Sequence, residues 1–160
     1  MGVEIERKFL VKRERLPELT GGTPVKQGYL PTDGLVSVRP RVKGGAGFLT
    51  VKGPSTEDGL SRAEFEYPIP LEDAEAMLDG LCADRTVMKT RYEIVVGGRL
   101  WEIDVFGGAN EGLIIAEVEL DRADEDIDLP EWAGTEVTGD VRFFNQRLAD
   151  RPWPEWGGDG

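Results

Sequence analysis

Hydrophobic and polar residues alternate along most of the chain, and short turn segments separate the alternating stretches. Successive side chains of a β-strand point to opposite faces, so this alternation predicts strands with one apolar face and one polar face. Turn residues between such stretches are typical of hairpins. The predicted strands are Val3–Lys12, Pro24–Leu30, Leu35–Lys43, Phe48–Lys52, Ser61–Ile69, Thr86–Val96, Leu100–Phe106 and Leu113–Leu120.

Two other segments are predicted to be helical. The apolar residues of Leu71–Cys82 have helical spacing, and a second helix is predicted over Val141–Ala149, where Asp140 can accept hydrogen bonds from the free N–H groups of the first turn. Residues 1–150 are expected to form a single domain, followed by an irregular tail at 151–160 that is rich in Pro, Trp and Gly. The residues of the first helix that are available for burial are Leu71, Met77, Leu78 and Leu81.

The polar faces of these strands are almost entirely ionic, and like charges come in pairs on single strands. Glu4 and Glu6, for example, share one face of the first strand with Lys8. Neighbouring like charges repel each other unless an opposite charge lies between them. The cations at such positions are Lys8, Arg39, Arg41, Lys52, Lys89 and Arg91, and the carboxylates are Glu4, Glu6, Glu64, Glu66, Glu102, Asp104, Glu117 and Glu119.

Two arrangements fit these faces: an open antiparallel sheet whose charged face meets bulk solvent, and a closed barrel with a charged interior. We favour the barrel, because solvated faces normally mix charged residues with Ser, Thr and Gln. Two helices are also available to cover part of the apolar outside. The predicted fold is therefore mainly β (α+β), an eight-stranded antiparallel closed β-barrel, or tunnel, with a few flanking helices.

The predicted interior must hold water or a ligand. Removing an ion from water costs several kcal/mol, so six cations and eight carboxylates would together exceed the roughly 5–15 kcal/mol that stabilises a whole domain. The summed charge of these six cations and eight carboxylates is −2, and two divalent metal ions would change it to +2. A triphosphate carries roughly −4 to −5 near neutral pH, so it would be attracted to the interior only with metal present.

Composition narrows the chemistry further. The 160-residue chain has a formal net charge of −12, one cysteine (Cys82) and no histidine. The absence of histidine excludes histidine general bases, Ser-His triads and common zinc motifs. The acidic charge argues against a broad nucleic-acid surface and suits hard cations that prefer oxygen ligands. With no apolar run approaching the roughly 18 residues of a membrane span and no secretory signal, we expect a cytoplasmic protein without a membrane partner.

The segment Glu4-Ile-Glu6-Arg-Lys8 resembles the E-x-E-x-K signature of the CYTH superfamily, the triphosphate tunnel metalloenzymes. That motif alone is weakly specific, whereas a series of similar blocks in the family's order is strongly specific. The other blocks are Gln27-Gly-Tyr29-Leu, the Arg39 and Arg41 pair, Leu49-Thr-Val-Lys52, Ser61–Tyr67, Lys89–Tyr92, Trp101–Phe106, Ala116–Leu120 and Glu136–Asp140.

The resemblance implies an eight-stranded tunnel that acts on a triphosphate with Mg²⁺ or Mn²⁺ as cofactor. It makes Glu4, Glu6 and Glu119 the first expected metal ligands, while Glu64, Glu66, Glu102, Asp104 and Glu117 would complete a second metal position or orient water. The phosphate chain would be bound by Lys8, Arg39, Arg41, Lys52, Lys89 and Arg91. Tyr29 and Lys52 would form a catalytic pair, although packing of Tyr29 against a neighbouring strand is an equal alternative.

The expected reaction is hydrolysis of inorganic tripolyphosphate to diphosphate and phosphate, because the chain is short, resembles the compact bacterial members and shows no base-reading insertion. The alternatives are a nucleoside or thiamine triphosphatase, a class IV adenylyl cyclase, and a non-catalytic polyphosphate-binding module. We expect a monomer or homodimer whose partner is the small-molecule triphosphate.

Two local features affect these expectations. Pro40 lies between Arg39 and Arg41 and cannot donate a ladder hydrogen bond, so the placement of Arg41 and of Lys43 depends on a non-bonded or bulged site at Pro40. The family resemblance suggests that the helix Val141–Ala149 can plug one tunnel end. From the sequence, ordinary packing of this helix outside the barrel is slightly favoured.

Overall fold

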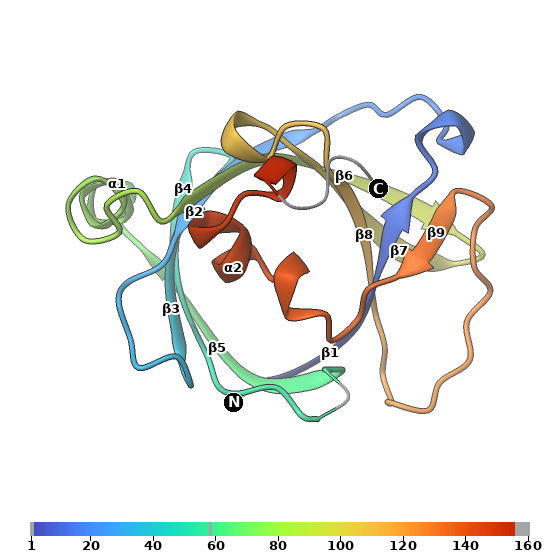
Figure 1. Ribbon diagram of the computed structural model, residues 1–160, viewed down its shortest axis with the longest axis horizontal. Helices are drawn as coiled ribbons and strands as arrows, with labels where there is room; N and C mark the ends of the chain where they lie inside the picture. The colour runs from blue at the N-terminus through green and yellow to red at the C-terminus, as the bar shows by residue number, and fades with distance from the viewer. Residues whose placement is uncertain (1, 58, 156–160) are drawn as a thin grey trace.

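The fold is a ring of antiparallel strands around a lumen (Figure 1), described by a computed structural model for residues 2–57 and 59–155. The strand order is β5-β4-β3-β2-β6-β7-β8-β1, and β1 also pairs with β5, which closes the ring. The prediction of a closed eight-stranded barrel is therefore confirmed, and the open sheet is excluded. The strands are β1 Gly2–Val11, β2 Thr23–Gly28, β3 Ser37–Lys43, β4 Ala46–Lys52, β5 Ser61–Ile69, β6 Thr86–Val96, β7 Arg99–Phe106, β8 Ile114–Glu119 and an extra strand, β9 Ala133–Glu136.

The hairpin between β6 and β7 shows how local sequence fixes the strand register. Val96 pairs with Arg99, so Gly97 and Gly98 alone form the loop, with φ angles of 59° and 79°. Positive φ at both loop positions is what a type I′ turn requires, and its twist matches that of the flanking strands. Every inward-facing residue on β6 and β7 is set by this register.

The extra strand β9 was not predicted, because its four residues, Ala-Gly-Thr-Glu, show no alternation. It pairs with the C-terminal part of β1, opposite Phe9 and Val11, whereas β5 pairs with the N-terminal part of β1. Together with the neighbouring loops it covers an apolar cluster on the outside of the barrel. That cluster consists of Phe9, Trp101, Ile103, Ala116, Val118 and Trp132.

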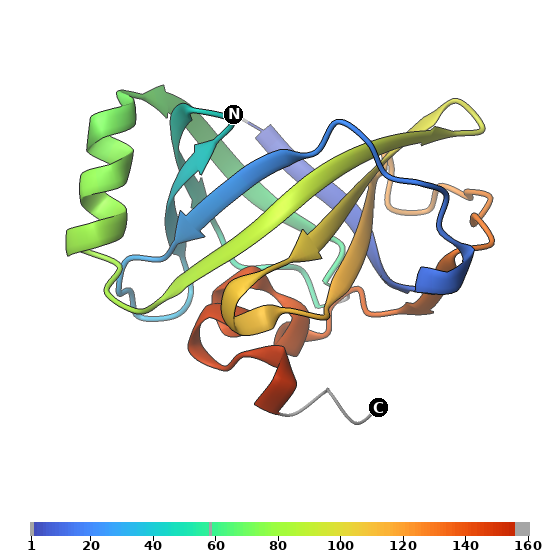
Figure 2. The same cartoon turned by 90° about the horizontal axis from the view of Figure 1, so that it is seen from above.

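Helix α1 (Leu71–Gly80) packs against the outside of β3 and β4 (Figure 2). Its buried residues are Ala74 and Leu78, which lie one turn apart and therefore share a face. Leu71 and Leu81, expected to be available for burial, are 38% and 54% exposed because they lie at the two ends of the helix. No helix among the described residues has the length and apolar character needed to cross a membrane.

The predicted helix Val141–Ala149 is broken into a 3₁₀ turn at Val141–Phe143 and a short helix, α2, at Asn145–Asp150. The break lies at Phe144, whose backbone is extended. Asp140 caps the 3₁₀ turn as predicted, since its side chain accepts a hydrogen bond from the Arg142 N–H. In the tail expected to be irregular, Trp153–Glu155 forms a further 3₁₀ turn, and residues 156–160 lie outside the described residues.

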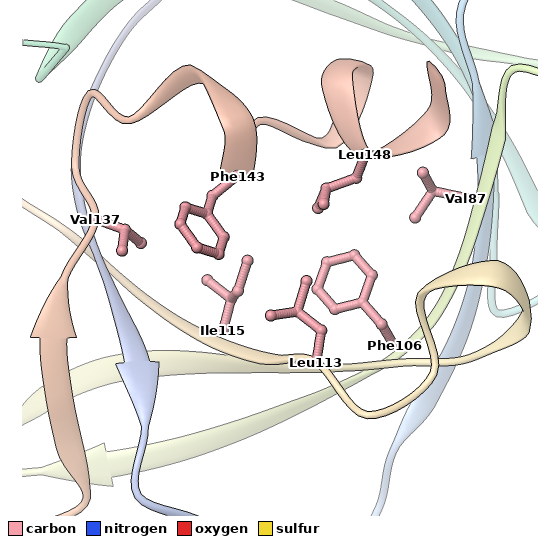
Figure 3. Packing of buried hydrophobic residues seen from close by; sticks show 7 residues of the cluster. All are labelled: Val87, Phe106, Leu113, Ile115, Val137, Phe143 and Leu148. Carbon is pink, nitrogen blue, oxygen red and sulfur yellow. The ribbon is translucent and has the colours of Figure 1, made fainter. Parts of the chain in front are cut away.

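This C-terminal segment, residues 140–150, lies across one end of the barrel (Figures 1 and 2). The expectation that it packs outside the barrel is therefore wrong. Phe143 and Leu148 reach a buried apolar cluster at that end (Figure 3). The barrel supplies Val87, Phe106, Leu113 and Ile115 to this cluster, and Val137 completes it.

The inward face of the barrel thus changes character along its length. On β6, Val87 precedes Lys89 by two residues, and on β8, Ile115 precedes Glu117 by two residues, so each pair points the same way. The apolar members pack against the C-terminal segment, and the charged members lie further along the lumen. The segment covers the apolar end because exposing that cluster to water would be unfavourable.

Candidate active site

A cavity of 380 Å³ occupies the lumen, and charged side chains form most of its wall. This volume lies within the roughly 300–1,000 Å³ that is usual for small-molecule sites. The structure brings all of the predicted phosphate-binding residues to the wall, together with seven of the eight predicted carboxylates. The remaining carboxylate, Asp104, lies behind the wall and is 1% exposed.

The carboxylates and most of the cations lie on opposite arcs of the barrel. The neighbouring strands β5, β1, β8 and β7 each carry two of the predicted carboxylates, and we call them the acidic arc. The neighbouring strands β4, β3, β2 and β6 form the basic arc, whose lining cations are Lys52, Arg39, Arg41, Lys43, Lys89 and Arg91. Only Lys8 and Arg62, among the lining residues described, are cations on the acidic arc.

Counting the residues that line the cavity corrects the charge balance expected from the sequence. Eight cationic side chains face seven carboxylates, so the wall has a balance of +1. The sequence count of −2 was wrong because Lys43 and Arg62 also line the cavity and Asp104 does not. Arg62 lies two residues before Glu64 on β5, so the alternation already indicated that both side chains face the lumen.

Where the two arcs meet, Lys52 bridges two glutamates. Its ammonium donates hydrogen bonds to both oxygens of Glu4, at 2.9 and 3.0 Å, and lies 3.5 Å from a Glu64 oxygen. Burial acts to raise the pKa of Glu4, but Lys52 overcomes this effect and lowers it to about 2. Burial and the hydrogen bond with Glu4 raise the pKa of Glu64. Lys52 therefore stabilises the ionised form of Glu4.

Glu6 is a buried carboxylate whose negative charge is only partly compensated by Lys8. Burial raises its pKa well above the usual value, and the nearby charge of Glu117 raises it further, against the attraction of Lys8. Glu6 also stands opposite Glu119 in the ladder between β1 and β8. For Glu117, burial is outweighed by Lys8 and Arg91, which lower its pKa. A hard cation bound beside Glu6 would relieve this excess of negative charge.

The donor set suits Mg²⁺ or Mn²⁺, because it consists of carboxylate oxygens without histidine or thiolate. Within residues 2–57 and 59–155, however, no three acidic or cysteine side chains converge on a point that could hold a metal ion. Glu4 is bound to Lys52, and Asp104 is engaged by two cations. The individual metal roles of the eight carboxylates remain predictions.

Asp104 organises the cations of β6. One of its oxygens lies 2.8 Å from the Lys89 ammonium, and Arg91 donates to both oxygens at 2.7 and 2.8 Å. Burial acts to raise the pKa of Asp104, but Lys89 and Arg91 hold it well below its usual range. Burial lowers the pKa of Lys89 to about 7, with Asp104 opposing that effect. Asp104 therefore orients two predicted phosphate-binding residues.

Gln27 is a buried residue that contacts the cavity wall from behind, and the sequence suggested no role of its own for it. Its carbonyl oxygen accepts a hydrogen bond from Arg41 Nε at 2.8 Å, and its Nε2 donates to the Tyr29 hydroxyl at 2.9 Å. Tyr29 lines the cavity, but no hydrogen bond among the described residues joins it to Lys52. The proposed pairing of Tyr29 with Lys52 in catalysis remains a prediction.

Pro40 is accommodated without displacing the arginines beside it. The paired residues of β2 and β3 end at Gln27 and Arg41. Pro40 therefore lies just beyond the β2–β3 ladder, where its missing N–H breaks no hydrogen bond of that ladder. Arg39 and Arg41 both line the cavity. Arg39 donates to Thr50 Oγ1 at 3.2 Å, while its Nε is buried without a hydrogen-bond partner among the described residues. Such a donor is costly in the free protein and available to a bound anion.

A sequence model of the CYTH domain matches residues 2–147, nearly the whole chain. The chain belongs to the CYTH domain family. The curated relatives of this CYTH domain include the inorganic triphosphatase of Acetivibrio thermocellus, which is 45% identical over 96% of this chain and 97% of the relative. The inorganic triphosphatase of Nitrosomonas europaea is 42% identical over 91% of this chain and 96% of the relative.

Solved structures are similar to this CYTH domain as well. A crystal structure of an inorganic triphosphatase superimposes with a TM-score of 0.67 at 36% sequence identity, covering 93% of this chain and 95% of that chain. The match therefore covers nearly the whole of both chains.

The C-terminal segment of the CYTH domain also contributes to the cavity wall. The Phe144 ring lies 5.0 Å from the Lys8 ammonium and 5.5 Å from the Arg62 guanidinium, within range of cation–π attraction. Asn145 Oδ1 accepts a hydrogen bond from Lys89 at 2.9 Å. Neither residue was a predicted site residue, because both contacts depend on the break in the helix at Phe144.

Proposed function

We propose that this CYTH domain is a metal-dependent inorganic triphosphatase that hydrolyses tripolyphosphate to diphosphate and phosphate. The observation that carries this proposal is the separation of charge in the cavity, with carboxylates on the acidic arc facing cations on the basic arc. The curated relatives of A. thermocellus and N. europaea, which are named inorganic triphosphatases, support the same activity.

The basic arc would bind the phosphate chain. Arginine can donate two parallel hydrogen bonds to phosphate oxygens, and Arg39, Arg41 and Arg91 all present guanidinium groups at the wall. Lysines act as compact charges, and Lys52 and Lys89 lie on the same arc. The unpartnered Nε of Arg39 would gain its missing acceptor from a phosphate oxygen.

The acidic arc would hold Mg²⁺ or Mn²⁺. Glu6 and Glu119 are the strongest candidates, because they are opposite each other in the β1 and β8 ladder and Lys8 only partly compensates the charge of Glu6. Glu4, Glu117 and the carboxylates of β5 and β7 would complete the ligand set or orient water. A bound divalent cation would supply neutralisation of the charge on the phosphate oxygens.

Hydrolysis of the triphosphate requires that the substrate is positioned and that negative charge on its oxygens is stabilised. Water attacks the terminal phosphorus in line with the bond to the bridging oxygen, that P–O bond breaks, and diphosphate departs with the bonding electrons, while the proton lost by the water passes to a phosphate oxygen or to solvent. Negative charge on the oxygens around the reacting phosphorus is stabilised by the preorganised cations of the basic arc. Asp104 and Gln27 contribute by fixing the donors that meet the substrate.

The deciding experiment is phosphate release by the purified protein from tripolyphosphate, ATP and thiamine triphosphate, each with Mg²⁺, with Mn²⁺ and with all divalent metal chelated. We expect tripolyphosphate to be the preferred substrate and chelation to abolish turnover. A preference for ATP or thiamine triphosphate would show that tripolyphosphate is not the main substrate. Binding without turnover would favour a polyphosphate-binding module, and turnover that persists under chelation would exclude the metal mechanism.

A further inference from the structure

The side-chain amide of Asn145 lies in the cavity wall with one end held in place. Its Oδ1 accepts a hydrogen bond from Lys89 Nζ at 2.9 Å and a second from Gln27 Nε2 at 3.3 Å. An ammonium group can only donate, so the oxygen of the amide, and not its nitrogen, must face Lys89. This contact fixes an amide orientation that would otherwise be ambiguous.

The orientation of Gln27 is fixed in the same way. Arg41 Nε can only donate, so the carbonyl oxygen of Gln27 faces Arg41 and its Nε2 faces Tyr29 and Asn145. Gln27 is fully buried, which leaves its amide little freedom to turn. Lys89 and Gln27 therefore hold the Asn145 oxygen from two sides.

The Nδ2 group of Asn145 must consequently point away from Lys89 and Gln27. No described residue accepts a hydrogen bond from this Nδ2 group. Among the described residues, the only buried side-chain nitrogen or oxygen without a partner is Arg39 Nε, so the Nδ2 group is accessible rather than enclosed. Lys89, which contacts the Asn145 oxygen, and Arg41, which lines the same cavity, are themselves donors. An amide N–H that shares a wall with these cations is suited to an acceptor-rich anion.

We propose that Asn145 is a substrate-binding residue whose Nδ2 group donates a hydrogen bond to a phosphate oxygen of the bound triphosphate. This inference rests on the proposed function, because it names a ligand contact in the same cavity. It gives the C-terminal segment a direct role in recognition in addition to its packing at the end of the barrel. Lys89 and Gln27 are positioning residues for this contact.

Asn145→Asp tests the proposal, because it retains an oxygen facing Lys89 and Gln27 but replaces the donor with a second oxygen. We expect the Kd for a hydrolysis-resistant tripolyphosphate analogue with NH bridges, measured by calorimetry with Mg²⁺, to rise about 10- to 100-fold, the usual effect of losing a hydrogen bond to a charged group. If Asn145 only held Lys89 in place, the carboxylate would hold it at least as well and the Kd would be unchanged.

Gln146→Glu is the matched control, since Gln146 is the adjacent residue, also lines the cavity and would carry the same added charge. We expect a rise in Kd of less than about 3-fold, because only through-space repulsion is added. Equal weakening in both variants, or unchanged binding by Asn145→Asp, would overturn the proposal. Wild-type binding of the analogue without hydrolysis of tripolyphosphate would overturn the proposed function alone, and failure of the wild type to bind would overturn both.

Discussion

The ammonium of Lys52 on β4 donates hydrogen bonds to both carboxylate oxygens of Glu4 on β1, at 2.9 and 3.0 Å. β5 lies between these two strands, so the contact spans the junction where the basic arc meets the acidic arc. A predicted phosphate-binding residue and a predicted metal ligand are therefore hydrogen-bonded to each other in the free protein. Metal binding at Glu4 has to share or displace this contact.

Lys52→Met separates these two roles. Removing the ammonium frees the Glu4 carboxylate, so we expect Mg²⁺, titrated calorimetrically without triphosphate, to bind about 10-fold more tightly. Phosphate release should fall at the same time, because a phosphate donor is lost. Lys26→Met, at an exposed position of β2, should change neither quantity. Unchanged or weaker Mg²⁺ binding by Lys52→Met would show that the two groups do not compete.

Glu6→Gln should abolish metal-dependent turnover while leaving the fold intact. The amide cannot supply the negative charge that attracts the cation, so we expect phosphate release at saturating Mg²⁺ to fall about 100-fold or more. Glu93→Gln makes the same chemical change at an exposed position of β6 and should retain wild-type activity. Near-UV circular dichroism checks the fold of both variants. Substantial turnover by folded Glu6→Gln would remove Glu6 from the metal site.

Arg39→Ala should weaken triphosphate binding. The substitution removes the guanidinium whose Nε has no partner among the described residues, and such a charged donor contributes about 10- to 100-fold in affinity. The KM for tripolyphosphate should rise by that factor. Arg122→Ala, which removes an exposed arginine paired with Asp124, should leave KM unchanged. An unaltered KM in Arg39→Ala would count against its place in the phosphate site.

Leu148→Ala tests the packing of the C-terminal segment. Leu148 is fully buried against the apolar cluster at the end of the barrel, so its truncation should lower the free energy of unfolding by about 2–5 kcal/mol. Chemical denaturation followed by tryptophan fluorescence measures this change. The neighbouring exposed residue gives the control Arg147→Ala, for which we expect a change within about 0.5 kcal/mol. Equal stability of the two variants would mean that the segment is not part of the core.

The barrel could be predicted from the sequence because a two-residue period and its turns are local signals. Strand β9 and the break at Phe144 could not be predicted, for different reasons. β9 is short and forms by pairing with the C-terminal part of β1. Phe144 adopts an extended backbone where the segment turns across the end of the barrel. Both depend on partners that are distant along the chain.

For the site, strand parity placed all but one of the predicted charged residues on the cavity wall but gave no information on contacts between strands. It predicted that Asp104 faces inward, yet its enclosure by Lys89 and Arg91 follows from the register of β6 and β7. Asn145 lies outside any alternating stretch, so only the path of the C-terminal segment brings it to the cavity.

The arrangement of the two arcs gives the barrel interior a dipole that runs across its width rather than along its axis. A divalent metal bound to a polyphosphate is itself polar, with its cation on one side and its uncovered oxygens on the other. Such a complex would be turned by this transverse field about the barrel axis before it makes any specific contact. The protein would thereby select one rotational orientation of its ligand.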